Sequence, residues 1–171
     1  DGLVLTQMNQ TGGIKSRFYA TKAIHYSTDI TDLTAPRGIL YDNSDGALNI
    51  ASALSVDGNT ITADTQKTAS NKKQPWIIKA EHGQLRKKGT VLYLWGNVRI
   101  HQDKGASNRS TLFTTSALTY YTKTRLAKTK RPVNITQGDG TQVSAIGMNA
   151  DLNTGQVNFL SQIRGRYEVQ P

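Results

Sequence analysis

PWIIKAEHGQLRKKGTVLYLWGNVRI, residues 75–100, alternates apolar and polar side chains with a period of two residues. This is the period of a β-strand, whereas an α-helix repeats its apolar positions every three or four residues. Within it, one face carries Leu92, Leu94, Val98 and Ile100, and the other face carries Val91, Tyr93 and Trp95. Two unlike faces predict strands of an antiparallel sheet with one packed side.

The rest of the chain repeats this pattern. Residues 76–80 and 155–165 also alternate, and turn signals with Gly occur at 57–58, 137–141 and 153–156. Helical periodicity is weak throughout. With 171 residues, the chain is predicted to be a single all-β domain spanning residues 1–171. Residues 43–74 differ in composition, and we expect them to form an inserted hairpin or loop.

The chain has a formal net charge of +9 and no cysteine. The charge favours anionic partners, although solvated faces and guarded strand edges would give the same composition. The lack of cysteine excludes thiol catalysis and cysteine-based metal sites. Because the sequence begins at Asp1, we expect a targeting or anchoring segment to be missing from it.

No catalytic, metal or cofactor site is expected. Glu81 and His82 are adjacent, and adjacent side chains on a strand point to opposite faces. The three histidines show no spacing typical of a zinc site. No nucleophile elbow or phosphate-binding glycine loop is present.

Several segments together resemble the LptC family of lipopolysaccharide-export proteins. The opening stretch matches the family pattern W-x-I-x-A-E-x-G followed by L-x-L-x-G-x-V-x-I. DLTAPRGILYD, residues 32–42, resembles the family segment L-T-x-P-x-x-x-L-Y-D, and the closing RGRYE resembles the family's R-x-x-Y-E. The matches occur in the family's order over nearly the whole chain, and residues 43–74 are the departure.

The resemblance implies an open, twisted β-jellyroll of two antiparallel sheets, without catalytic residues or cofactors. It implies a periplasmic domain anchored to the inner membrane by an N-terminal helix that this sequence lacks. Such a domain would accept lipopolysaccharide from an inner-membrane transporter of the LptB/LptF/LptG type at one edge. It would pass the lipid to an LptA-like soluble bridge protein at the other edge, and nucleic acid would not be a partner.

The inward faces are the expected lipid-binding groove. Leu33, Val157 and Tyr167 fall where the aligned family lines its groove, and the other candidates follow from the alternation. These are Trp76, Ile78, Leu92, Leu94, Val98 and Phe159. A plain sandwich core would show the same pattern. Gly12 and Gly140 occupy aligned family glycines, which we expect in turns beside the docking edges.

Two other functions are compatible with the sequence. A basic β-sandwich could bind acidic polymers, nucleic acid or glycan, through the cluster at residues 123–131. An enzyme could use His82 with Glu81, although side-chain alternation opposes that arrangement.

Overall fold

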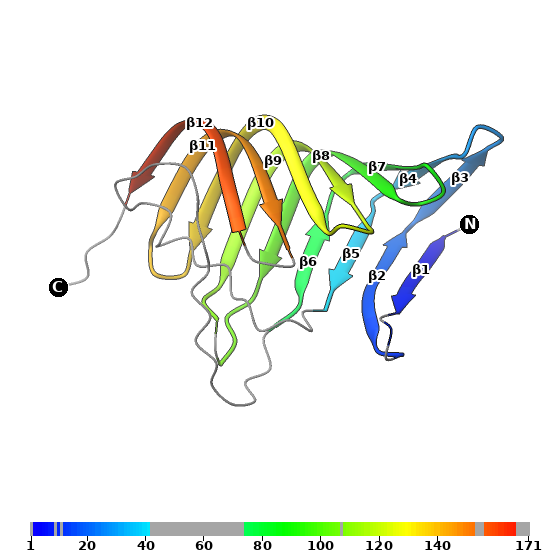
Figure 1. Ribbon diagram of the computed structural model, residues 1–171, viewed down its shortest axis with the longest axis horizontal. Helices are drawn as coiled ribbons and strands as arrows, with labels where there is room; N and C mark the ends of the chain where they lie inside the picture. Colours follow the sequence, from blue (N-terminus) through cyan, green and yellow to red (C-terminus); the bar gives the residue numbers. More distant parts are fainter. Residues whose placement is uncertain are drawn as a thin grey trace.

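The computed structural model describes residues 2–8, 10, 12–41, 74–106, 108–152 and 156–166. The described residues form only β-strands and turns, which confirms the all-β prediction (Figure 1). The predicted insertion at 43–74 lies outside the described residues except for Gln74.

All paired strands are antiparallel and belong to one hydrogen-bonded sheet. Its first seven strands are short: β1 (Leu3–Met8), β2 (Ile14–Ala20), β3 (Lys22–Tyr26), β4 (Ile30–Thr34), β5 (Arg37–Leu40), β6 (Trp76–Lys79) and β7 (His82–Arg86). The last five are long: β8 (Val91–Gln102), β9 (Thr111–Tyr121), β10 (Leu126–Gln137), β11 (Gln142–Asp151) and β12 (Gln156–Arg166).

The sheet is folded along a crease that crosses each of the long strands and lies between the short ones. The long strand β8 pairs with β7 through its first half and with β6 through its second half. Consequently β6 and β7 are two halves of one bent strand, broken at Ala80 and Glu81. The backbone hydrogen bonds continue through the break, because the Glu81 N–H donates to the Gly96 carbonyl at 2.9 Å and the Ala35 N–H donates to the Glu81 carbonyl at 2.8 Å.

In the long strands, the crease appears as irregular pairing. The register between β8 and β9 shifts between Trp95 and Val98, and β10 and β12 carry similar shifts at the same level of the sheet. Gly96, Asn97 and Gln162 have positive φ angles there. An extra residue bends a strand and increases its twist, so these bulges turn each strand from one half of the sheet to the other.

The crease divides the sheet into two leaves that face each other. Leaf A contains β1, β2, β5, β6 and residues 98–102, 111–115, 132–137, 142–145 and 163–166 of the long strands. Leaf B contains β3, β4, β7 and residues 91–95, 117–121, 126–129, 148–151 and 156–159. Figure 1 shows the long strands arching over this crease, with β1 at one end of the molecule and β12 at the other.

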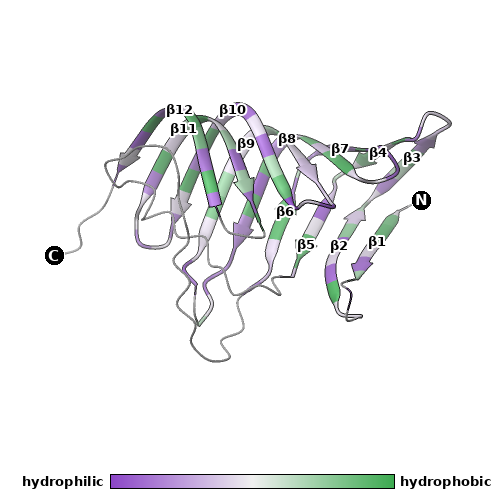
Figure 2. Cartoon of the chain, viewed as in Figure 1, coloured by the Kyte–Doolittle hydropathy of each residue, from purple (hydrophilic) through white to green (hydrophobic). Residues whose placement is uncertain are grey.

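Side chains from both leaves meet in one apolar cluster. The Phe18 ring of leaf A lies 6.3 Å from the Tyr120 ring of leaf B, measured between centroids. Within leaf A, the Trp76 and Phe113 rings meet edge to face at 5.8 Å. Green and purple alternate along the strands in Figure 2, as expected when every second side chain enters this cluster.

A glycine in the crease provides a test of how tightly the bend is built. A Cβ at Gly96 would lie 2.5 Å from the Glu81 carboxylate, and the φ of Gly96 is +76°. We predict that Gly96→Ala lowers the free energy of unfolding by about 2–4 kcal/mol, the sum of left-handed backbone strain and displacement of a neighbour. Urea denaturation measures the loss.

Gly89 supplies the matched control. It lies in the β7–β8 turn with a φ of +79°, and a Cβ there would have no heavy atom within 4 Å. Gly89→Ala therefore carries the backbone strain alone, about 1–2 kcal/mol. Equal losses in the two variants would contradict a tightly built crease.

Candidate lipid-binding interior

The inner face of leaf A has an apolar row. These residues are opposite one another on successive strands and run from β2 to β11: Phe18, Gly38, Ile78, Ile100, Phe113, Ile135 and Val143. Gly38 is required in this row because a Cβ there would lie 2.5 Å from the Phe18 ring. The row forms a continuous apolar surface from one end of leaf A to the other.

The inner face of leaf B has two such rows. The row nearer the crease includes Leu33, Gly83, Leu94, Leu118, Met148 and Phe159. The next row contains Leu85, Leu92, Tyr120, Ala127, Ala150 and Val157. The space between the leaves is therefore lined by hydrocarbon on both sides.

The end of leaf A farthest from the crease, called here the rim of leaf A, is polar on its inner side. Gln102, Thr111 and Gln137 lie opposite one another there and are buried. The Gln102 amide donates to the Gln74 carbonyl at 2.6 Å, and the Gln137 amide donates to the Thr111 hydroxyl at 3.5 Å. The interior thus changes from apolar near the crease to polar at the rim.

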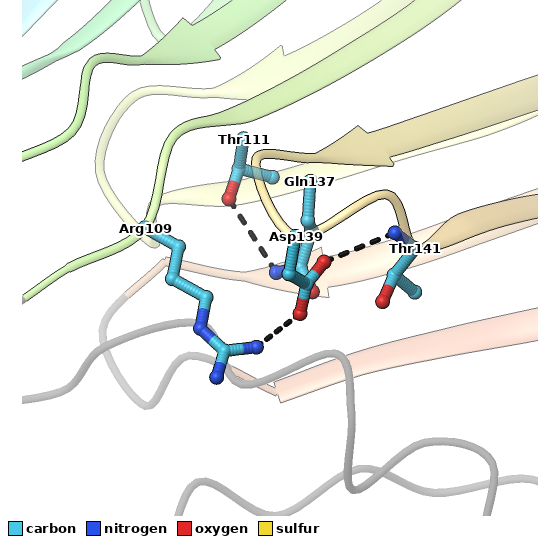
Figure 3. A network of polar contacts seen from close by, with 5 residues as sticks. All are labelled: Arg109, Thr111, Gln137, Asp139 and Thr141. Carbon is cyan, nitrogen blue, oxygen red and sulfur yellow. Dashed lines mark hydrogen bonds and ion pairs between the residues drawn. The ribbon is translucent and has the colours of Figure 1, made fainter. Parts of the chain in front are cut away.

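A network of polar contacts stabilises this rim (Figure 3). Asp139, in the β10–β11 turn, forms an ion pair with Arg109 and accepts a hydrogen bond from the Thr141 N–H at 3.0 Å. The Gly138 N–H also donates to the Ser110 carbonyl at 2.9 Å. The hydrogen bond from Thr141 is the main reason that the pKa of Asp139 lies below its ordinary value, and Arg109 adds to the lowering.

Leaf B holds a buried tyrosine beside a buried arginine. Tyr120 is 2% exposed and Arg125 is 7% exposed, and the guanidinium donates a hydrogen bond to the phenol. Burial raises the pKa of Tyr120, while the charge and the hydrogen bond of Arg125 partly oppose that rise. Arg125 adopts a φ of +55° in the β9–β10 turn, which places it under the apolar row rather than on the surface.

The family described as "Lipopolysaccharide-assembly, LptC-related" matches residues 1–168. The chain belongs to this family. Among curated proteins, none matches the sequence closely enough to indicate relatedness. The predicted resemblance to the LptC family is confirmed over nearly the whole chain.

A solved structure supports the fold of this LptC-related chain. It is the crystal structure of LptH from Pseudomonas aeruginosa, described as the LptA-homologous periplasmic component of the conserved lipopolysaccharide transport device. The TM-score is 0.56 at 12% sequence identity, over 91% of this chain and 95% of LptH. At this identity the likeness concerns the fold, and it confirms the predicted β-jellyroll.

The structure gathers the predicted groove residues between the two leaves. All eight of those described are buried, with exposures from 1% to 6%: Leu33, Trp76, Ile78, Leu92, Leu94, Val98, Val157 and Phe159. In this structure they belong to one buried apolar cluster that draws side chains from both leaves. Tyr167 lies outside the described residues. Lipid binding by these side chains stays a prediction.

The two predicted glycines both lie in turns with positive φ. Gly12, between β1 and β2, has a φ of +82° and no heavy atom within 4 Å of an added Cβ. Gly140, in the β10–β11 turn, has a φ of +85°. Each turn adjoins strands near one end of the sheet, and a docking role for either stays a prediction.

Sequence reasoning missed more than half of the buried apolar cluster, namely its residues on β2, β5, β9, β10 and β11. The strands β9 and β11 show why. Thr111 and Phe113 are buried before the crease and Leu118 and Tyr120 after it, so the inward positions change from odd to even. The strand β11 makes the same change, from Val143 and Ala145 to Met148 and Ala150. The signal that could have identified the inward residues of β9 was the alternation within TLF, residues 111–113, and within ALTYY, residues 117–121, each taken separately.

The side chains considered for catalysis take structural positions instead. Glu81 accepts a hydrogen bond from the Asn97 amide at the crease, and His82 stacks on Trp95 at 5.7 Å on the outer face of leaf B. Within the described ranges, no group of three or more metal-ligating side chains comes together. The same ranges contain no helix long and apolar enough to cross a membrane.

The basic cluster at residues 123–131 is not one surface. Arg125 is buried with Tyr120, whereas Lys128, Lys130 and Arg131 are exposed on the strand β10. The hypothesis of a polyanion site built from the whole cluster therefore loses one of its members. Lys128 instead lies over the Tyr121 ring at 5.7 Å from its centroid.

The raised pKa of Tyr120 predicts a pH-dependent loss of stability. Above the ordinary tyrosine pKa of 10.0, the unfolded chain ionises while the folded phenol stays neutral. The contribution of Tyr120 to the free energy of unfolding is thus complete below about pH 10 and is lost as the pH rises toward the folded pKa. Urea unfolding between about pH 8 and pH 11 measures this loss.

Tyr120→Phe should be less stable than the wild type by about 1–3 kcal/mol at pH 8, because Arg125 loses a buried partner. The difference in stability should shrink at alkaline pH, because only the wild type loses stability when Tyr120 ionises in the unfolded chain. Tyr26→Phe, at a phenol that is 44% exposed, is the control and should leave the pH dependence unchanged. A difference that stays constant with pH would contradict the assignment.

Proposed function

We propose that this domain is a non-enzymatic conduit that carries lipopolysaccharide through the periplasm with its acyl chains held between the two leaves. The observation that carries the proposal is the membership of the LptC-related lipopolysaccharide-assembly family, joined to an interior lined by hydrocarbon on both leaves. The predicted groove residues, Tyr167 included, are the proposed contacts.

The energetic need for such an interior is large. Burial of a methylene group is worth about 0.8 kcal/mol, so an exposed acyl chain of twelve or more carbons costs on the order of 10 kcal/mol. A lipopolysaccharide molecule has several such chains. A protein that keeps them out of water throughout the transfer removes most of this barrier without any chemical step.

The polarity of the interior suits an amphiphile. Acyl chains would lie along the apolar rows near the crease, whose members include Ile100 and Leu94, while sugars would meet Gln102, Thr111 and Gln137 at the rim of leaf A. In a plain sandwich core the buried positions would be apolar out to the rim. The buried amides and hydroxyls there are groups that hydrogen-bond sugar hydroxyls.

Loading requires the leaves to move apart, and the fold allows this. Backbone hydrogen bonds join the leaves through the strands at the crease, whereas side chains meet across the interior, as the Phe18 and Tyr120 rings do. Acyl chains that replace those contacts restore apolar burial, so the opened, loaded state keeps most of the hydrophobic stabilisation. The packed side chains act as a plug in the unloaded state.

The ends of the sheet are suited to transfer between proteins. Among the described strands β1 pairs only with β2, and LVLTQM contains no charged residue or proline to block strand addition. Val4 and Met8 are 65% and 59% exposed on it. We propose that one end of the sheet joins the inner-membrane LptB/LptF/LptG-type transporter and the other joins an LptA-like bridge protein, by β-augmentation.

In this proposal the domain is held at the inner membrane by an N-terminal helix. It contributes no catalytic residue, since transfer needs only a continuous apolar path and successive partners of the same fold. The energy for extraction would come from the transporter.

Photo-crosslinking tests the location of the acyl chains. A photoreactive phenylalanine analogue in place of Phe159, which is 5% exposed and faces inward, should capture lipopolysaccharide. The same analogue in place of Leu160, which is 50% exposed on the opposite face, should not. Electrophoresis and immunodetection of the lipid measure capture, and labelling from position 160 alone would refute the interior site.

Charged substitutions test the docking role of β1. Val4→Lys with Met8→Lys should abolish binding to one of the two purified partners, the transporter or the bridge protein, because charge on an edge strand opposes strand addition. Tyr121→Lys, on the central strand β9 and 37% exposed, is the control. Unchanged binding to both partners would exclude β1 as a docking edge.

A further inference from the structure

The outer face of leaf A places three basic side chains directly opposite one another. Arg37 on β5 pairs with Lys79 on β6, and Lys79 pairs with Arg99 on β8. These residues are far apart in the sequence, and all three are exposed. We call them the leaf A basic row. Like charges opposite each other on neighbouring strands destabilise a sheet, so the row has a cost to the fold.

None of the ion pairs in the described part of the chain involves this row, although Asp103 lines the same cleft as Lys79 and Arg99. The one described ion pair joins Arg109 to Asp139, away from it. Thr114 and Asn134 continue the row on β9 and β10, and both are uncharged. Asp103, just beyond β8, is the carboxylate nearest to Arg99 in the sequence. Three cations and one nearby carboxylate leave the row with a net positive charge, which favours an anionic ligand.

A cleft lies beside the row. It has a volume of about 520 Å³, and Lys79, Arg99 and His101 line one part of it. Ser110, Thr111 and Gln137 line another part, together with Asp103 and Gly138. The cleft therefore brings two basic side chains and one carboxylate next to hydroxyl and amide groups, a set of partners that can bind a phosphorylated sugar.

The walls of the cleft are held in place by the polar network of Figure 3. The hydrogen bond from the Gly138 N–H to the Ser110 carbonyl holds the β10–β11 turn against residues 108–110, and the bond from the Gln137 N–H to the Thr141 carbonyl closes the turn itself. The pKa of His101 lies below its ordinary value, mainly because the side chain is partly buried. The charge of Asp103 opposes this lowering, and the positive charges of Lys79 and Arg37 add to it. Its imidazole can therefore serve as a neutral hydrogen-bonding group there.

The cleft adjoins the interior at the rim of leaf A. Gln102, Thr111 and Gln137 belong both to the cleft and to the polar inner row. A molecule with acyl chains between the leaves would thus present its polar end toward the cleft.

We propose that this cleft binds a phosphorylated sugar, the headgroup of the lipid whose acyl chains lie between the leaves, with Lys79 and Arg99 as its phosphate contacts and Arg37 beside them. The inference rests on the proposed function and adds to it a headgroup site outside the apolar interior. The cargo is then held at two places, by hydrophobic burial and by charge.

The test compares two neutralised variants of the full chain. The first is Arg37→Gln, Lys79→Gln and Arg99→Gln, which removes the leaf A basic row. The second is Lys128→Gln, Lys130→Gln and Arg131→Gln, which removes the same charge from the outer surface of β10. The probes are bisphosphorylated lipid A and the same lipid with both phosphates removed, and the measurement is the dissociation constant at low salt.

The first variant should bind the bisphosphorylated lipid about tenfold more weakly or worse, since charge-assisted hydrogen bonds to phosphate are lost. It should bind the dephosphorylated lipid as the wild type does, and the second variant should change neither value by more than about threefold. Equal losses in both variants, or no effect of removing the phosphates, would overturn the headgroup site.

Two controls separate a headgroup site from a structural role of the row and from binding to a bilayer surface. The first variant should be at least as stable as the wild type at low salt, because repulsion within the row is relieved; a loss of stability would show that the row serves the fold and would overturn the proposal. Vesicles of phosphatidylglycerol test for a bilayer ligand, and a loss of vesicle binding equal to the loss for lipid A would also overturn it.

Capture of the dephosphorylated lipid by the photoreactive group at position 159 keeps the two proposals distinguishable. Capture by the wild type and by the first variant alike, with weakened binding of the phosphorylated lipid, supports both the interior and the cleft. Failure of capture in the wild type refutes the interior. Capture with no effect of the phosphates refutes the cleft alone.

Discussion

The bend at the crease, which the long strands make within their length, is the constraint on which the rest of this structure depends. A flat antiparallel sheet of this width would leave one apolar face in water, and folding it in two buries that face against itself. Extra residues in β8, β10 and β12 accomplish the bend where the strand pairing shifts. At the break at Ala80 and Glu81, backbone hydrogen bonds still join the neighbouring strands. The apolar interior and its polar rim both follow from this fold.

The crease also separates two kinds of contact within the sheet. Hydrogen bonds hold the strands together along the crease, while the faces of the two leaves meet through side chains. Hydrogen bonds are directional and short, whereas apolar contacts can be exchanged for other apolar contacts at little cost. In the proposed function, a sheet folded in this way would admit hydrocarbon between its leaves and keep its strand pairing.

Period-two alternation predicts inward residues correctly along a whole strand only where it continues across the crease, and strand pairing decides where it continues. In β8 the inward residues Leu94 and Val98 keep the same parity across the crease, since the bulge at Gly96 and Asn97 adds one residue relative to β9. The strand β9 lacks that extra residue, so its inward positions change parity between Phe113 and Leu118. The parity change depends on how two strands pair, which is not a property of either strand's sequence.

By itself, the sequence determined that the chain is all-β and which residues of the opening stretch face inward. These follow from local periodicity and from the alternation of neighbouring side chains. Only the tertiary structure decided that Arg125 is buried and that Arg37, Lys79 and Arg99 stand side by side. The physical reason is register: hydrogen bonding between distant strands sets which side chains become neighbours, and a shift of one residue would place each on the other face.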